Sequence, residues 1–124
     1  MKYLQKYASA KKLSSDDFAT LCDIYNNKKE GYQEVSEIIV TYNEPLVSML
    51  IHKFYPTYMA SHLDDLKQEG LFAICQNFHK YDSAKGRWST FISFWIVGAV
   101  REWVDSLHGV TAHQRKTVNN LNKA

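Results

Sequence analysis

Apolar residues recur at helical spacing through most of the chain, and this pattern predicts a protein built of helices. In the segment LSSDDFATLCDIYNN, Ser and Asp occupy capping positions at the start, and one helix face is then formed by Phe18, Leu21, Cys22 and Tyr25. The segment GYQEVSEIIVTY repeats the spacing at Val35, Ile38, Ile39 and Tyr42. No part of the sequence has a pattern that predicts a series of strands, so we expect an all-α fold, a compact helical bundle.

The middle of the chain continues the pattern with two interruptions. Asn43-Glu44-Pro45 predicts either a kink or a new helix with Pro45 at its first position. The following segment LVSMLIHKFY stops at Pro56, and PTYMASH is interpreted as a polar link. In the next helical segment, LDDLKQEGLFAICQNFHKY, we expect the inward residues to be Leu63, Leu66, Phe72 and Ile74.

A long helix is predicted from about Ser89 to Leu107, after the turn DSAKGR and before Gly109. At roughly 100° per residue, its core stripe consists of Ile92, Ile96, Ala99, Val100, Trp103 and Leu107. Three further rings, Phe91, Phe94 and Trp95, lie beside this stripe on the flank shared with Gly98 and Arg101. A last short helix is predicted within the final fourteen residues, TAHQRKTVNNLNKA.

Length and composition narrow the class of protein. The 124 residues correspond to one domain, and no amino-terminal segment has the parts of a signal peptide. The longest nearly apolar run, FISFWIVGAV, has ten residues, about half of a membrane span. Cys22 and Cys75 both lie inside helical patterns, so we expect buried, reduced thiols and a cytoplasmic protein.

The charge is distributed unevenly along the chain. Residues 1–70 carry 8 Lys and Arg against 10 Asp and Glu, whereas residues 71–124 carry 7 against 3. The excess of positive charge in the second part is consistent with a polyanionic partner, and equally with a solvated basic tail.

The segment YDSAKGRWSTFISFW packs five aromatic rings into fifteen residues. Any one of these rings could pack under another helix. Taken together, however, the rings lie beside three cations, Lys80, Lys85 and Arg87. Aromatic faces interleaved with cations are typical of surfaces that stack unpaired bases and hold phosphates. We therefore expect a surface that binds, and perturbs, nucleic acid.

The segment DDLKQEGLFAICQNFHKYDSAKGRWSTFISFWIVGAVREWV resembles the σ2 domain of bacterial σ70-type sigma factors. The matching residues are Asp65-Leu66, Gln68-Glu69-Gly70, Tyr81-Asp82, Gly86, Trp88-Ser89-Thr90-Phe91 and Trp95-Ile96. NEPLVSMLIHKFY is similar to the Asn-x-x-Leu-Val helix of that family. The resemblance divides the chain into an amino-terminal helical segment (1–42), a σ2-like part (43–107), and a basic tail or the start of a following segment (108–124).

The resemblance implies a transcription initiation factor that binds core RNA polymerase and recognises and melts the promoter −10 element. Its contacts to the polymerase clamp coiled coil would come from Asn43, Asp65, Gln68 and Glu69. Stacking on the −10 non-template strand would involve Trp88, Phe91, Phe94 and Trp95. Contacts to phosphates or bases would come from Lys80, Lys85, Arg87, Gly98 and Arg101. The resemblance leaves two alternatives open, a short sigma-like factor or a fragment that lacks the −35-binding domain. In the first case a separate subunit would supply −35 contacts, and no catalytic residue, metal or cofactor is implied.

Other classes of function fit the sequence less well. The five histidines, at positions 52, 62, 79, 108 and 113, show no metal-ligand spacing, and there is no Gly-rich phosphate loop or nucleophile elbow. A duplex-reading helix is disfavoured because Glu102 and Asp105 oppose Arg101. The remaining alternative is a sigma-like regulatory or interaction module that binds polymerase or another protein without opening DNA.

Overall fold

The computed structural model of the protein describes residues 2–109 and shows an all-α fold, which confirms the expected class. Residues 2–109 contain no strand, and their α-helices are α1 (Lys2–Ala8), α2 (Ser15–Asn26), α3 (Val35–Phe54), α4 (Met59–Asn77) and α5 (Trp88–Leu107). The short helix predicted within residues 111–124, and most of the tail predicted at 108–124, lie outside the described residues.

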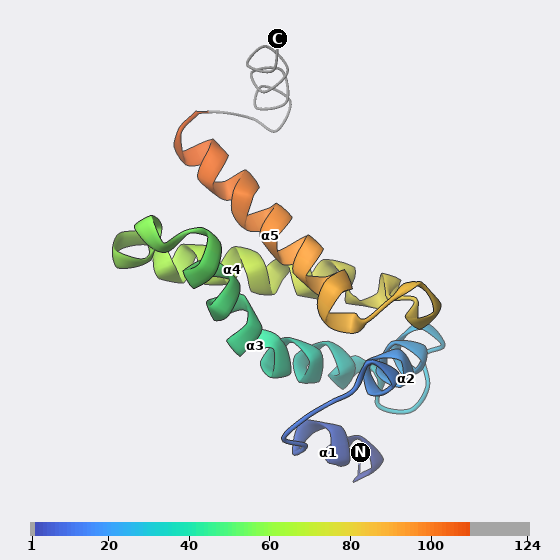
Figure 1. The fold of residues 1–124 in the computed structure, drawn as a ribbon. Helices are drawn as coiled ribbons and strands as arrows, with labels where there is room; N and C mark the ends of the chain where they lie inside the picture. Colours follow the sequence, from blue (N-terminus) through green and yellow to red (C-terminus); the bar gives the residue numbers. More distant parts are fainter. Residues whose placement is uncertain (1, 110–124) are drawn as a thin grey trace.

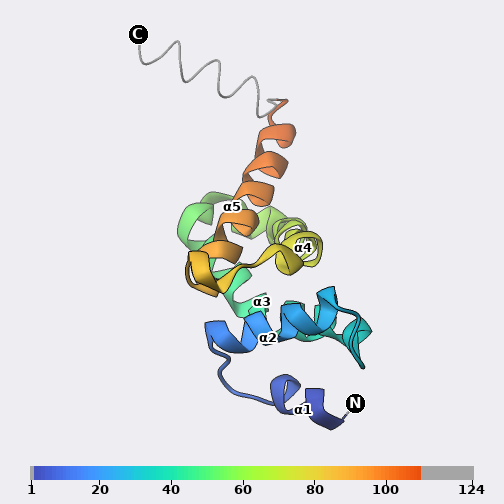
Figure 2. The same cartoon turned by 90° about the vertical axis from the view of Figure 1, so that its right-hand side faces the viewer.

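Three long helices make the centre of the molecule. α4 packs against both α3 and α5, and α5 crosses α4 diagonally (Figure 1). α2 lies near the amino-terminal half of α3, and α1 lies beyond it (Figure 2). The end of α5 and helix α1 are therefore at opposite ends of the molecule in both views.

Helix α2 begins with the capping residues that the sequence predicted. The Ser14 hydroxyl accepts a hydrogen bond from the backbone N–H of Asp17, and the Asp17 carboxylate accepts one from the backbone N–H of Ser14. This reciprocal capping box satisfies two backbone donors that a helix start otherwise leaves unpaired.

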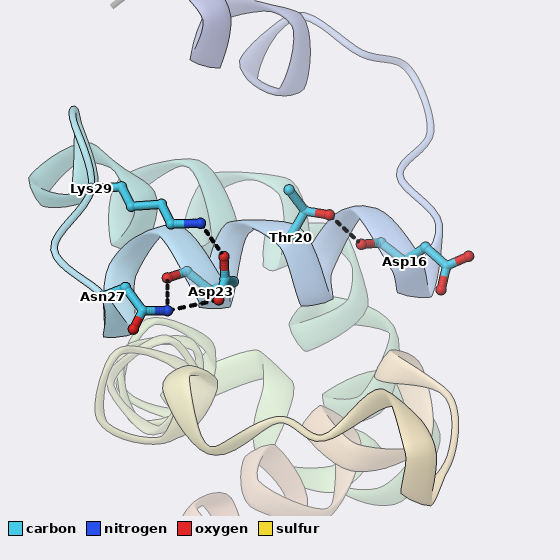
Figure 3. A network of polar contacts seen from close by, with 5 residues as sticks. All are labelled: Asp16, Thr20, Asp23, Asn27 and Lys29. Atoms are coloured by element: carbon cyan, nitrogen blue, oxygen red, sulfur yellow. Dashed lines mark hydrogen bonds and ion pairs between the residues drawn. The ribbon is translucent and has the colours of Figure 1, made fainter.

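The solvent side of α2 carries a chain of polar contacts (Figure 3). Near the helix start, the Thr20 hydroxyl donates to the backbone carbonyl of Asp16. Near its end, the Asp23 carboxylate accepts from Asn27 Nδ2 at 2.7 Å and from Lys29 Nζ at 2.6 Å. The Lys29 hydrogen bond and charge lower the pKa of Asp23. The two bonds attach the turn after α2 to the helix itself.

Helix α3 is a single α-helix that contains Pro45, so no new helix begins at Asn43-Glu44-Pro45. Its buried positions form one stripe that continues past the proline: Val35, Ile39, Asn43, Val47, Leu50 and Ile51. An interior proline weakens a helix by removing one hydrogen bond. Here packing of the continuous stripe outweighs that cost. The predicted boundary between residues 42 and 43 thus falls inside a helix.

The segment PTYMASH is mostly helical, which corrects its interpretation as a polar link. Pro56–Tyr58 form a 3-10 turn, and α4 starts directly afterwards at Met59. The only non-helical dihedrals within α4 as described are at His62, with φ −133°.

The inward face of α4 is formed by Leu66, Gly70, Ala73, Ile74 and Asn77. Leu66 and Ile74 therefore lie where the sequence predicted, and Leu63 packs against the core while remaining partly exposed. The prediction for Phe72 was wrong, because this side chain is 59% exposed. Phe72 is two positions from both Gly70 and Ile74, and two steps of roughly 100° carry a residue to the other side of a helix.

Gly70 marks the point where α3, α4 and α5 meet. A Cβ atom at this position would lie 2.7 Å from Val47 Cγ1 and 3.3 Å from Ile96 Cγ2. The close approach of the three helices therefore requires a residue without a side chain.

Helix α5 starts one residue before its predicted position and ends at the predicted Leu107. Ile92, Ile96 and Val100 are buried as expected. Leu107, by contrast, is 46% exposed, because the last turn of α5 projects past α4 (Figure 1). Val104 is the last apolar residue of the helix that the structure buries.

The two cysteines have different environments, so the expectation that both are buried was half wrong. Cys22 is buried in the core, and burial raises the pKa of its thiol to about 12. Cys75 is exposed, because it follows the inward residue Ile74 by one position and so points away from the core. None of the helices described is both long and apolar enough to cross a membrane.

Candidate nucleic-acid interface

Trp88, which the sequence analysis assigned to base stacking, lies in the core instead. The side chain is 3% exposed, and its ring stacks on that of Phe18 with centroids 4.3 Å apart and planes 12° apart. Its backbone N–H donates to the Ser15 hydroxyl at 3.0 Å. The ring already has an aromatic partner from α2, so it offers no face to a base in this structure.

Asn43, which was predicted to contact polymerase, is also internal, with 4% of its surface exposed. Its amide oxygen accepts a hydrogen bond from Trp88 Nε1 at 3.0 Å, and its amide nitrogen donates to the Ile39 carbonyl at 2.7 Å. Both the oxygen and the nitrogen of the side-chain amide therefore have hydrogen-bond partners inside the protein. Its position fits a role in fixing Trp88 rather than a direct contact with a partner.

Of the other three predicted rings, Phe91 and Trp95 are half-buried and Phe94 is exposed. Phe91 is half-buried, with its ring centroid 5.3 Å from that of Tyr81 and 5.8 Å from that of Trp88. Trp95 is half-buried one turn further on, and Phe94 is 73% exposed with its ring edge-on to Trp95 at 5.5 Å. The structure therefore presents Phe94 at the surface, with the half-buried Trp95 beside it.

Lys80 is positioned directly against this aromatic group. Its Nζ lies 4.9 Å from the centroid of the Trp95 ring, a cation–π geometry, and donates to Asn77 Oδ1 at 3.0 Å. The contact holds a positive charge at the edge of an accessible ring.

A hollow of about 390 Å³ brings several of the predicted residues together. Its aromatic wall is formed by Tyr81, Phe91 and Trp95, and its rim carries Lys80, Lys85 and Arg87. Small-molecule sites typically enclose roughly 300–1,000 Å³. A hollow of this size with aromatic walls and three cations has the size and chemistry to hold a base with its phosphate.

The loop that forms this rim is fixed by local hydrogen bonds. The Tyr81 hydroxyl donates to the Gly86 carbonyl at 2.8 Å, and the Asp82 carboxylate accepts from the backbone N–H of Ala84 at 3.0 Å. Gly86 has φ 149° and ψ −173°, a conformation that is essentially restricted to glycine. The Lys-Gly-Arg turn thus projects its two cations on either side of a residue that must be glycine.

Gly98 and Arg101 lie on a second groove, of about 840 Å³, that also includes Phe94 and Trp95. A Cβ atom at Gly98 would have nothing within 4 Å, and Arg101 is exposed one turn later. The groove is therefore open at Gly98 and carries a cation beside the opening.

Two residues of this second groove were missed by the sequence analysis. Lys53 and Phe54, at the end of α3, line the groove opposite α5, and Phe54 is 50% exposed. A lysine followed by an aromatic at the end of an amphipathic helix was the available signal. This signal does not by itself indicate a binding site, because only the fold shows that the end of α3 lies next to α5.

The predicted polymerase-binding residues of α4 share one exposed face. Asp65 and Gln68 are exposed, and Glu69 is half-buried. The Asp65 carboxylate lies 3.9 Å from His62 Nδ1. This face is separate from the hollow that contains Phe91 and Trp95. Residues 2–109 contain no group of three or more His, Cys, Asp or Glu side chains that could hold a metal ion.

Comparison with known proteins gives one match. A family model described as Sigma-70 region 2 matches residues 39–108, which is more than half of the chain. No curated protein and no solved structure matches. The matched residues include most of α3 together with all of α4 and α5.

Proposed function

Because the chain belongs to the Sigma-70 region 2 family, whose domains bind RNA polymerase and recognise promoters, we propose that it also melts the promoter −10 element by capturing an unpaired base. The hollow between the Lys-Gly-Arg turn and α5 is the observation that carries this proposal. Phe91 and Trp95 supply its stacking surfaces. Lys80, Lys85 and Arg87 place three positive charges in its lining, against one carboxylate, that of Asp82.

The energies of base capture are compatible with this surface. Extruding a base from a duplex costs a few kcal/mol. Each base stacked on an aromatic side chain contributes about 1–3 kcal/mol. Trp95 and the 73%-exposed Phe94 offer two accessible rings, and cations at the rim add favourable contacts with phosphate. Stacking on Trp95 in the hollow and on Phe94 in the adjoining second groove can therefore offset the cost of opening one base pair.

Under this proposal Trp88 acts from within the core. Its stack on Phe18 and its hydrogen bond to Asn43 fix the first turn of α5. Phe91 and Trp95 follow at one-turn intervals on the same helix, so their positions depend on that attachment.

We also propose roles for the second groove and for the exposed face of α4. Arg101, beside the open backbone at Gly98, would contact the base pair upstream of the captured base, with Lys53 and Phe54 on the opposite side of the groove. Asp65, Gln68 and Glu69 would contact the clamp coiled coil of polymerase from the exposed face of α4.

The test compares two DNA fragments that differ only in whether the −10 non-template strand is paired. We expect Trp95→Ala to weaken binding to the unpaired fragment by roughly tenfold, since a stacked base contributes about 1–3 kcal/mol, and to affect duplex binding much less. Fluorescence anisotropy with the purified chain measures both affinities. Phe72→Ala is the matched control, because it removes an exposed ring from α4 outside the two grooves. Equal losses on both fragments would remove the stacking role and favour an interaction module that does not open DNA.

A further inference from the structure

A third groove lies between α4 and α5, towards the end of α5 that is farther from the nucleic-acid interface. It encloses about 320 Å³, and its principal lining residues are Glu69, Phe72, Gln76, Glu102, Trp103 and Ser106. None of these residues lines the hollow that contains Lys85 and Arg87. The groove is therefore separate from the hollow proposed for base capture, and it adjoins the second groove, which Gln76 and Glu102 also line.

The walls of this groove are aromatic. Phe72 is 59% exposed, and Trp103 is half-buried with its ring edge-on to that of His62 at 5.4 Å. Between them the floor is made by small side chains, Ala73 and Ala99. Aromatic side chains around a concave apolar floor are frequent anchor points in protein–protein interfaces.

The edges of the groove are acidic. Glu69 lies on α4 and Glu102 on α5, and no cation within residues 2–109 forms an ion pair with either carboxylate. The nearby Lys67 is not available to them, because its Nζ pairs with Glu44 of α3 at 3.0 Å. Two unpaired carboxylates on either side of two aromatic rings are complementary to a cation with a flat face.

Arginine is the side chain that fits this combination. Its planar guanidinium stacks on aromatic rings and donates several N–H groups in a fixed plane to carboxylates. A lysine ammonium has neither the flat face nor the second set of donors.

We propose that this groove receives an arginine side chain from a helix of core RNA polymerase, with the guanidinium against Phe72 and Trp103 and its N–H groups donating to Glu69 and Glu102. The inference rests on the proposed contact between α4 and polymerase. Glu69 already belongs to the face formed with Asp65 and Gln68, and the groove extends that face onto α5.

The experiment measures the affinity of the full chain for core RNA polymerase of its host by fluorescence anisotropy, without DNA. Glu102→Lys places a like charge against the arginine, so we expect a loss on the order of tenfold or more, diminishing as salt is added. Phe72→Ala is expected to weaken binding by a similar factor at all salt concentrations. The matched controls are Glu37→Lys, a charge reversal at an exposed position on α3, and Phe94→Ala, which removes an exposed ring of the nucleic-acid interface. Both controls are expected to bind like the unaltered chain.

Each outcome separates this inference from the proposed function. If the unaltered chain binds polymerase and Glu102→Lys, confirmed as folded by circular dichroism, binds equally well, the arginine contact is wrong and polymerase binding stands. Failure of the unaltered chain to bind would overturn both. If sedimentation shows that Glu102→Lys abolishes self-association of the chain and leaves polymerase affinity unchanged, the groove receives a second copy and the inference is overturned.

Discussion

The tryptophans at positions 88 and 95 illustrate how two chemically identical side chains acquire different roles. Trp88 is 3% exposed and has both a stacking partner and a hydrogen-bond acceptor, whereas Trp95 faces the hollow and contacts only Lys80 and Phe94 among the aromatic and cationic pairs described. The sequence predicted an aromatic surface but could not show which of the two tryptophans is buried and which is half-buried. The partner of Trp88, Phe18, lies 70 residues away in the chain, and only the fold shows that the two meet.

Replacing Trp88 should therefore damage stability first. We expect Trp88→Ala to lower the free energy of unfolding by about 3–5 kcal/mol, as for other buried large aromatics. Phe94→Ala should change it by no more than about 0.5 kcal/mol, because its ring is largely in solvent. Urea denaturation of both variants provides the measurement. A Trp88→Ala protein as stable as the unaltered chain would show that the ring is not part of the core.

The two cysteines give a chemical test of the described packing. A thiol-selective reagent at pH 8 should modify Cys75 rapidly in the folded protein, because this side chain is exposed. Cys22 should react only after unfolding, because it is buried and its pKa is raised to about 12, which leaves almost no thiolate. We expect one modified thiol under native conditions and two in urea, counted by mass spectrometry. Cys75→Ser should abolish the native reaction, and a persistent native reaction in that variant would contradict the burial of Cys22.

At the scale of helices, periodicity and caps were sufficient to predict most of the secondary structure. The capping box of α2 and the ends of α5 are local features, so the sequence contains them directly. Pro45 was ambiguous because its effect depends on tertiary packing: the buried stripe of α3 continues on both sides of it. Phe72 was misplaced for a related reason. The inward face of α4 is marked by small residues, Gly70 and Ala73, rather than by its largest apolar one.

Gly70 and Gly98 form a natural pair for testing the helix crossing. Alanine favours a helix over glycine by roughly 1 kcal/mol, but a Cβ at position 70 would meet Val47 at 2.7 Å. Overpacking of this kind typically costs about 1–3 kcal/mol, so we expect Gly70→Ala to be destabilising. Gly98→Ala has nothing within 4 Å and should be neutral or stabilising. Thermal unfolding monitored by circular dichroism compares the two variants. Equal stabilisation by both would mean that the three helices can separate at no cost.

At the scale of the molecule, α5 connects the two proposed surfaces. Phe91 and Trp95 face the nucleic-acid hollow, and Trp103 lies in the groove proposed for polymerase. The rise of an α-helix is about 1.5 Å per residue, which separates Phe91 from Trp103 by roughly 18 Å along one rigid element. Polymerase bound at one end would therefore hold the stacking surface at a fixed position.

The excess of positive charge in the second part of the chain has a measurable consequence at this scale. The affinity K for the unpaired strand falls as salt is added, so a plot of log K against log salt concentration has a negative slope. If Lys85 and Arg87 each contact one phosphate, replacing either by alanine should make this slope less steep by about 0.7. Lys6→Ala is the control, because this residue lies on α1 and lines none of the grooves described. Titrations at several salt concentrations supply the slopes. An unchanged slope in the Lys85 and Arg87 variants would place the phosphates elsewhere.

The stack of Phe18 on Trp88 shows that the residues of the family match and the residues that form the core are not the same set. The family match begins at residue 39, whereas the ring that covers Trp88 belongs to α2, between Ser15 and Asn26. A fragment cut at residue 39 would retain every residue of the family match and leave one face of its buried tryptophan in water. We therefore expect a fragment that starts at residue 39 to be less stable than the whole chain, although it contains the entire family match.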